Sequence, residues 1–178
     1  VLLVVALMSP LIQVKGHNRG RKILLIDTSA SMQHVGVSGK SRLQEAVEQA
    51  CDYVQTAQNT RFSIATVDAA GAKILAVDIA DANSLMRTLQ GIVCSDSGGS
   101  LTQAQGALDT LAGNAKEGEN SADLLVYTDS AGAADYEALR TRGKKELYVS
   151  GSATANVTNE YTAFSSRDDG FFDVMVSV

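Results

Sequence analysis

Short apolar runs, each followed at once by polar residues, mark the chain from residue 22 onward. Residues 23–26 are all aliphatic, and residues 124–127 form a second apolar run. Strands that are apolar on both faces are typical of the centre of a parallel sheet, where other elements cover both sides. Asp27 ends the first run, and Thr128 and Asp129 follow the second. Two central strands are therefore predicted to end in polar clusters that contain an aspartate.

Segments of helical periodicity separate these runs. Apolar positions recur every three or four residues over residues 41–57, which predicts an amphipathic helix. Residues 62–67 and 73–79 are predicted strands joined by a short turn, so the second is expected to be antiparallel and at an edge of the sheet. The remaining predictions are helices that begin at Asp81 and Thr102, a short helix over residues 133–140 and a last core strand over residues 146–149.

Alternating strands and helices predict an α/β domain. We expect a doubly wound, mostly parallel central sheet of the Rossmann-like kind, flanked by helices and carrying one antiparallel edge strand. In such sheets the ligand crevice lies at the carboxyl ends of the strands. The polar clusters at Asp27 and Asp129 are therefore expected to face that crevice.

Charge and cysteine content restrict the functional classes. The chain has 178 residues, 15 basic against 20 acidic side chains, and a formal net charge of -5. This balance argues against nucleic-acid binding, which needs a basic face. Two cysteines, Cys51 and Cys94, do not make a disulfide framework. Four further aspartates are interpreted as solvated surface charges: Asp52, Asp68, Asp78 and Asp109.

The segment after the first apolar run carries candidate metal ligands. Asp27, Ser29 and Ser31 offer one carboxylate and two hydroxyls from a single turn. These are hard oxygen donors, which suit Mg²⁺, Mn²⁺ or Ca²⁺ and do not suit zinc or copper. The same serines could instead cap the next helical segment without any metal.

At these residues the chain resembles the von Willebrand factor A family, whose metal-ion-dependent adhesion site begins with Asp-x-Ser-x-Ser. The resemblance runs from about residue 22 to residue 149 and implies two further ligands, Thr102 from a second loop and Asp129 from a third. Ser100 is the alternative to Thr102. The chain departs from the family at two positions, because Leu101 precedes Thr102 and Ser130 follows Asp129, where glycine is common.

The two ends of the chain resemble bacterial aerotolerance-type (Bat-like) membrane proteins. Residues 1–12 are largely apolar and residues 15–22 are rich in basic side chains. This pattern favours the end of a truncated transmembrane helix, although a buried strand remains an alternative. The resulting division is a membrane helix and basic linker over residues 1–21, the von Willebrand A domain over residues 22–152, and a terminal strand or the start of a β-rich domain over residues 153–178. The layout implies a membrane-anchored domain on the extracytoplasmic face.

The resemblance implies a binding module and not an enzyme. A divalent cation held by Asp27, Ser29, Ser31, Thr102 and Asp129 would bind an aspartate or glutamate carboxylate of a partner protein. No nucleophile elbow or phosphate-binding loop is present in the sequence. Two alternatives remain: a structural scaffold domain of a membrane complex whose metal site is incidental or degenerate, and a metal-dependent hydrolase on a similar fold.

Overall fold

The computed structural model describes residues 20–113, 121–129 and 132–151 with their side chains, and residues 161–166 and 172–177 as backbone strands. The predicted membrane segment falls almost wholly on residues 1–19, outside the described residues, and the domain boundary near residue 153 also lies outside them. Within the described part, no helix is long and apolar enough to cross a membrane.

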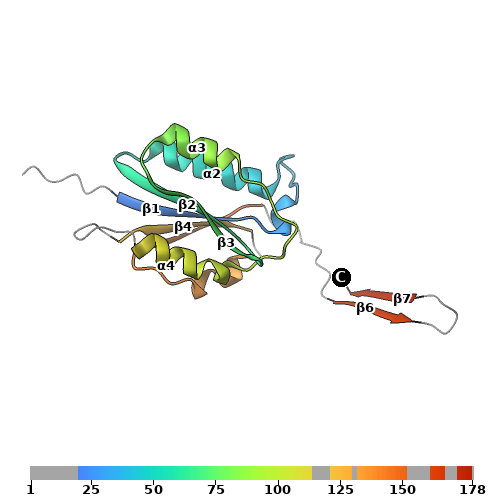
Figure 1. The fold of residues 1–178 in the computed structure, drawn as a ribbon. Helices are drawn as coiled ribbons and strands as arrows, with labels where there is room; N and C mark the ends of the chain where they lie inside the picture. Colours follow the sequence, from blue (N-terminus) through green and yellow to red (C-terminus); the bar gives the residue numbers. More distant parts are fainter. Residues whose placement is uncertain (1–19, 114–120, 130–131, 152–160, 167–171, 178) are drawn as a thin grey trace, which may run out of the picture.

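Five strands form one sheet in the order β3-β2-β1-β4-β5 (Figure 1). β1 pairs in parallel with both β2 and β4, β4 pairs in parallel with β5, and β3 is antiparallel to β2 at one edge. The predicted mostly parallel sheet with one antiparallel edge strand is thus confirmed. The strand bounds are β1 (Gly20–Asp27), β2 (Thr60–Asp68), β3 (Gly71–Ile79), β4 (Asp123–Thr128) and β5 (Lys145–Val149).

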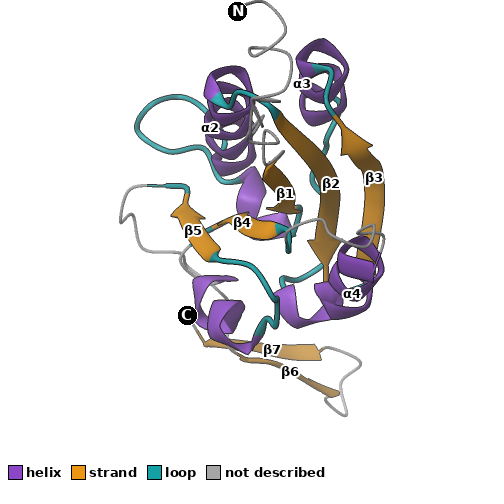
Figure 2. Ribbon diagram, turned by 90° about the vertical axis from the view of Figure 1, so that its left-hand side faces the viewer, coloured by secondary structure: helices purple, strands orange, loops and turns teal. Residues whose placement is uncertain are grey.

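Helices cover both faces of the sheet (Figures 1 and 2). One face packs on α2 (Arg42–Thr56) and α3 (Ala82–Gln90), and the other on α4 (Gln105–Gly113) with the 3₁₀ segments η2 (Leu101–Ala104) and η3 (Gly132–Ala138). Leu24 and Ile26 contribute to the first core and Ile23 and Leu25 to the second, all of them at most 3% exposed. Two buried faces explain why the run of β1 is apolar at every position.

Side-chain caps start the first two helices where the sequence predicts. Ser41 and Gln44 form a reciprocal capping box at α2, and Asp81 caps α3 through the backbone N–H of Ser84. The helix expected to begin at Thr102 opens instead with the 3₁₀ segment η2. Ser100 occupies the capping position there, but its side chain makes no capping hydrogen bond.

The last core strand and the short helix predicted before it differ from the observed elements. The strand predicted as a core strand at residues 146–149 is β5, which among the described strands pairs with β4 alone and is half-buried over most of its length. The helix predicted over residues 133–140 is the 3₁₀ segment η3. Residues 153–178 are predicted as a terminal strand or the start of a β-rich domain, and within them β6 (Tyr161–Ser166) and β7 (Phe172–Ser177) form an antiparallel pair of their own.

The interpretation of Asp78 as a solvated charge is wrong. Its carboxylate accepts hydrogen bonds from Arg21 Nε at 3.2 Å and from Arg61 Nη1 at 2.8 Å, and its backbone has a φ of 55° at an irregularity between β2 and β3. Partial burial alone would raise the pKa of Asp78, but the hydrogen bonds from the two arginines outweigh it and hold that pKa below its ordinary value. Asp78 is therefore a structural ion-pair residue of the edge strand.

Asp78→Asn is expected to lower the free energy of unfolding at pH 7 and to have progressively less effect in acid. A carboxylate with a lowered pKa in the folded state stabilises the fold above the pKa of the unfolded chain, and this contribution is lost as the pH falls through the folded-state value. Urea denaturation of both proteins between pH 7 and about pH 3 measures the difference. A difference that stays constant across this range would contradict the assignment.

Candidate metal centre

The first loop of the site forms around the carboxylate of Asp27, the last residue of β1. Asp27 is 1% exposed, and its Oδ1 accepts the backbone N–H of Ser29 at 2.9 Å. This bond turns the chain tightly into the 3₁₀ segment η1 (Ala30–Gln33) and places the hydroxyls of Ser29 and Ser31 3.1 Å apart. The carboxylate and both predicted hydroxyl donors thus belong to one turn at the carboxyl end of the central strand.

The second loop, residues 95–100, is bonded directly to the first. The carbonyl oxygen of Ser97 accepts a hydrogen bond from the N–H of Ala30, and the N–H of Ser95 donates one to the carbonyl oxygen of Thr28. Gly99 packs closely on Ser29, because a Cβ at this glycine would lie 3.4 Å from the Ser29 hydroxyl oxygen. The two loops therefore form one surface at the edge of the sheet.

The two alternative ligands of the second loop lie together. The hydroxyl oxygens of Ser100 and Thr102 are 3.0 Å apart, and Thr102 is exposed. Within the described part of the chain, neither hydroxyl hydrogen-bonds to Asp27, Ser29 or Ser31. Both hydroxyls belong to the segment that contacts Ser29, so the geometry does not distinguish Ser100 from Thr102 as the candidate ligand.

The third loop begins at the end of β4, beside β1. Because the two strands are parallel neighbours, Thr128 lies next to Asp27 and donates its hydroxyl to Asp27 Oδ2 at 2.6 Å. Asp129, fully buried, accepts the backbone N–H of Gly132 at 3.0 Å. A Cβ at Gly132 would lie 2.8 Å from Asp27 Oδ2, so the loop that binds Asp129 also passes against Asp27. The structure therefore brings the two aspartates to the same edge.

Sequence reasoning missed Arg42, the first residue of α2. Its guanidinium Nη1 lies 2.9 Å from Asp129 Oδ2 and 3.3 Å from the carbonyl oxygen of Ser31, and the residue is 3% exposed. A buried cation thus already neutralises one of the two carboxylates. The sequence contained one signal for Arg42. A basic residue at the N-terminus of a helix is unfavourable for the helix dipole, which indicates that another contact holds it there.

The donor set fits a hard divalent cation. Asp27, Ser29, Ser31 and Asp129, with a hydroxyl from Thr102 or Ser100, would offer only oxygen, as Mg²⁺, Mn²⁺ and Ca²⁺ prefer. No cluster of three or more histidine, cysteine, aspartate or glutamate side chains able to hold a metal is found among the described residues. A bound cation would therefore depend on hydroxyls and water as well as on the two carboxylates.

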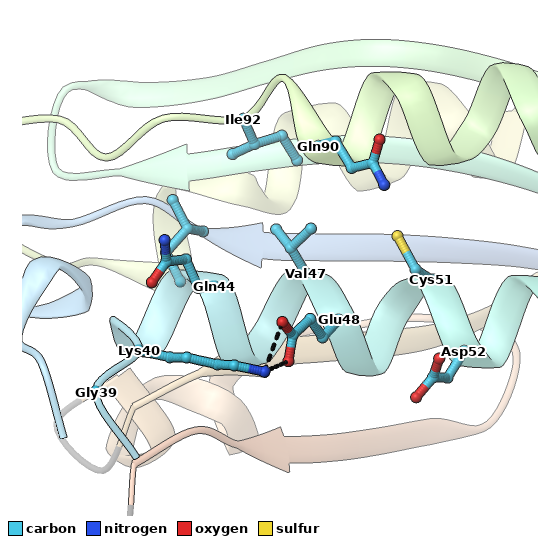
Figure 3. A pocket seen from close by; sticks show the side chains of 10 residues that line it. Gly39, Lys40, Gln44, Val47, Glu48, Cys51, Asp52, Gln90 and Ile92 are labelled. Atoms are coloured by element: carbon cyan, nitrogen blue, oxygen red, sulfur yellow. Dashed lines mark hydrogen bonds and ion pairs between the residues drawn. The ribbon is translucent and has the colours of Figure 1, made fainter. Parts of the chain in front are cut away.

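A groove of about 520 Å³ between α2 and the end of α3 is separate from this site (Figure 3). Its wall includes Val47, Cys51 and Ile92, and Lys40 and Glu48 form an ion pair of 2.6 Å along it. Burial raises the pKa of the Cys51 thiol, which disfavours a nucleophilic thiolate at neutral pH. The thiols of Cys51 and Cys94 are both free, in keeping with the absence of a disulfide framework.

Asp27→Ala is expected to destabilise the metal-free domain by about 1–3 kcal/mol, because Ser29 N–H and the Thr128 hydroxyl lose a buried acceptor. Asp27→Asn keeps a side-chain oxygen for Ser29 and should retain most of the stability. Chemical denaturation in chelator compares the two variants with the wild type. Equal stability of Asp27→Ala and the wild type would show that these hydrogen bonds do not hold the turn.

Comparison with known proteins agrees with this architecture. Residues 23–132, which include all five predicted ligands, match the von Willebrand factor type A domain. BatB from Bacteroides thetaiotaomicron is similar over 89% of this chain and 80% of its own, with 22% identity and a TM-score of 0.56. An aerotolerance-related membrane protein from Bacteroides fragilis NCTC 9343 is similar over 89% and 81%, with 17% identity and a TM-score of 0.60.

A more distant structural relative is proximal thread matrix protein 1 from the mussel byssus, similar over 74% of this chain and 37% of its own at 13% identity, with a TM-score of 0.54. No curated protein sequence matches the chain significantly. At identities this low, the structural similarity shows a shared fold. The family match covers more than half of the chain. The chain belongs to the von Willebrand factor type A domain family, and its fold resembles that of the Bat-like proteins.

Proposed function

We propose that this domain binds a partner protein through a divalent cation held by Asp27, Ser29 and Ser31 with Asp129 and a hydroxyl of the second loop. Mg²⁺ is the expected cation, with Mn²⁺ and Ca²⁺ as alternatives. The observation that carries the proposal is the convergence of Asp27 and Asp129 at the carboxyl ends of neighbouring strands, beside the paired hydroxyls of Ser29 and Ser31.

The low number of carboxylates favours capture of one more from a partner. Hydroxyls and water would fill the remaining coordination positions of the cation, and an aspartate or glutamate of the partner would take the place of one water. The aspartates are buried, whereas Ser31 is half-buried and Thr102 exposed. The hydroxyl side of the site is therefore the side from which a partner would approach.

The descriptions of the relatives support an interaction role. One is described as a membrane protein and another as a matrix protein, and neither description denotes an enzyme. The hydrolase alternative needs a general base near the metal. The described residues contain no third carboxylate or histidine clustered with Asp27 and Asp129, so a binding role is better supported than catalysis.

A scaffold role without metal is the second candidate. The ion pair between Arg42 and Asp129 already compensates one buried carboxylate, and hydrogen bonds from Ser29 and Thr128 satisfy Asp27. Groups of the chain itself thus compensate both buried carboxylates, and we expect the fold to form without a cation. Binding that persists in chelator would favour this second role.

The expected result of removing the metal is loss of partner capture without loss of the fold. Immobilised wild-type domain should capture its partner from detergent-solubilised membranes in Mg²⁺ and release it in chelator. Asp27→Asn should lower the Mn²⁺ affinity by at least about 100-fold. Even loss of a residue that only supports a metal ligand lowers metal affinity by about 10- to 100-fold. Asp52→Asn, a change at an exposed aspartate of α2, is the matched control and should behave as the wild type. Equal Mn²⁺ affinity of Asp27→Asn and the control would contradict the metal site.

We also propose that the apolar N-terminal run anchors the domain in a membrane, with the domain on the extracytoplasmic face. The apolar residues 1–12 and the basic residues after them support the anchor. Protease added to intact cells or spheroplasts should digest the domain in the full-length protein. Protection until lysis would contradict the extracytoplasmic placement, and extraction without detergent would contradict the anchor.

A further inference from the structure

Arg42 connects the first and third loops of the candidate metal centre. One guanidinium nitrogen, Nη1, contacts both the carboxylate of Asp129 and the backbone carbonyl of Ser31, residues that flank the centre from two loops. The ion pair is almost completely buried, with 3% and 1% of the two side chains exposed. Water therefore screens the charge of Arg42 very little, and its field acts on whatever binds between these loops.

The surroundings of Arg42 hold the guanidinium in place. Gly151, with a φ of 89°, packs so closely that a Cβ there would lie 2.7 Å from Arg42 Nε. The backbone N–H of Gly151 is itself bound by the Glu45 carboxylate at 3.1 Å. Arg42 Nε is buried and has no hydrogen-bond partner among the described residues. The buried pair of Arg42 and Asp129 is not explained by stability alone. A cation at the start of a helix opposes the helix dipole, and a buried ion pair contributes little net stability.

The charges at the centre explain what Arg42 changes. A divalent cation held by the carboxylates of Asp27 and Asp129 alone would give a neutral site with little attraction for another anion. Arg42 adds one positive charge, so the loaded site would carry a single net positive charge. One further carboxylate neutralises that charge, and the same positive charge weakens binding of the metal alone.

We propose that Arg42 is a positioning and charge-setting residue that couples metal binding to capture of one carboxylate. This inference rests on the proposed function. It predicts that the cation binds weakly to the free domain and more tightly when a carboxylate is present, and that the carboxylate in turn binds more tightly when the metal is present. The two affinities change by the same factor, because coupling between two sites is reciprocal.

The test measures Mn²⁺ binding by calorimetry, with and without acetate, in the wild type and in Arg42→Gln. Sodium chloride replaces acetate at equal ionic strength in the reference titrations, so that screening is constant. In the wild type, acetate should lower the Kd for Mn²⁺. In Arg42→Gln, the Kd without acetate should fall about tenfold, because a nearby like charge is removed, and acetate should no longer change it.

Two control variants separate this role from a purely structural one. Arg42→Lys keeps the charge and should restore much of the acetate effect. Arg21→Gln removes the other buried arginine, which lies in β1 and pairs with the partly exposed Asp78 of β3, and should leave both the Mn²⁺ affinity and the acetate effect unchanged. A structural role would make Arg42→Gln bind Mn²⁺ more weakly than the wild type, the opposite of the expected direction.

The outcomes distinguish this inference from the proposed function. No Mn²⁺ binding by the wild type would overturn the metal site and the inference together. Mn²⁺ binding that acetate leaves unchanged in the wild type would overturn the inference alone, even if Arg42→Gln does not fold. Equal affinities and equal acetate effects in the wild type and Arg42→Gln would also overturn the role of Arg42 and leave the metal site intact.

Discussion

Burial of two aspartates at the ends of adjacent strands is the constraint around which this edge of the domain is organised. A carboxylate removed from water is unfavourable unless hydrogen bonds or opposite charges compensate it. Asp27 is compensated by Ser29 and Thr128, and Asp129 by Gly132 and Arg42. Ser29 and Gly132 belong to the first and third loops, whereas Thr128 ends β4 and Arg42 begins α2, so the bonds that satisfy the carboxylates also tie the loops to these elements.

The rest of the sheet makes this arrangement possible. β1 is buried on both faces and pairs in parallel with β2 and β4, which aligns the carboxyl ends of three strands. The second loop is then held against the first by backbone hydrogen bonds, at Ala30 and Ser95. At this edge Thr102 is exposed and Ser31 half-buried, whereas Ser29 and the two carboxylates are buried.

Much of the fold could be predicted because the relevant signals are local. Apolar runs identify β1 and β4, and the capping side chains of Ser41 and Asp81 mark the starts of two helices. Predictions were less accurate where context decides. β5 resembles a core strand in sequence, yet its position at the edge leaves it half-buried. The segment at Thr102 begins as a 3₁₀ turn, at which Ser100 makes no capping hydrogen bond.

The candidate ligands could be named from a family pattern, whereas their supporting residues could not. The bond from Thr128 to Asp27 and the pair of Arg42 with Asp129 join residues 101 and 87 positions apart, and a single sequence carries no direct record of such contacts. Asp78 shows the same limit, since its two arginine partners are distant in the chain and it was interpreted as a surface charge. Local patterns thus locate the site, and the tertiary structure determines its electrostatics.

The central claim is that a divalent cation binds where the three loops meet. Anomalous diffraction from crystals of the domain grown with Mn²⁺ tests this most directly. The account predicts one strong anomalous peak among the hydroxyls of Ser29 and Ser31 and the carboxylates of Asp27 and Asp129. A peak bound elsewhere, or no peak between these loops at saturating Mn²⁺, would contradict it.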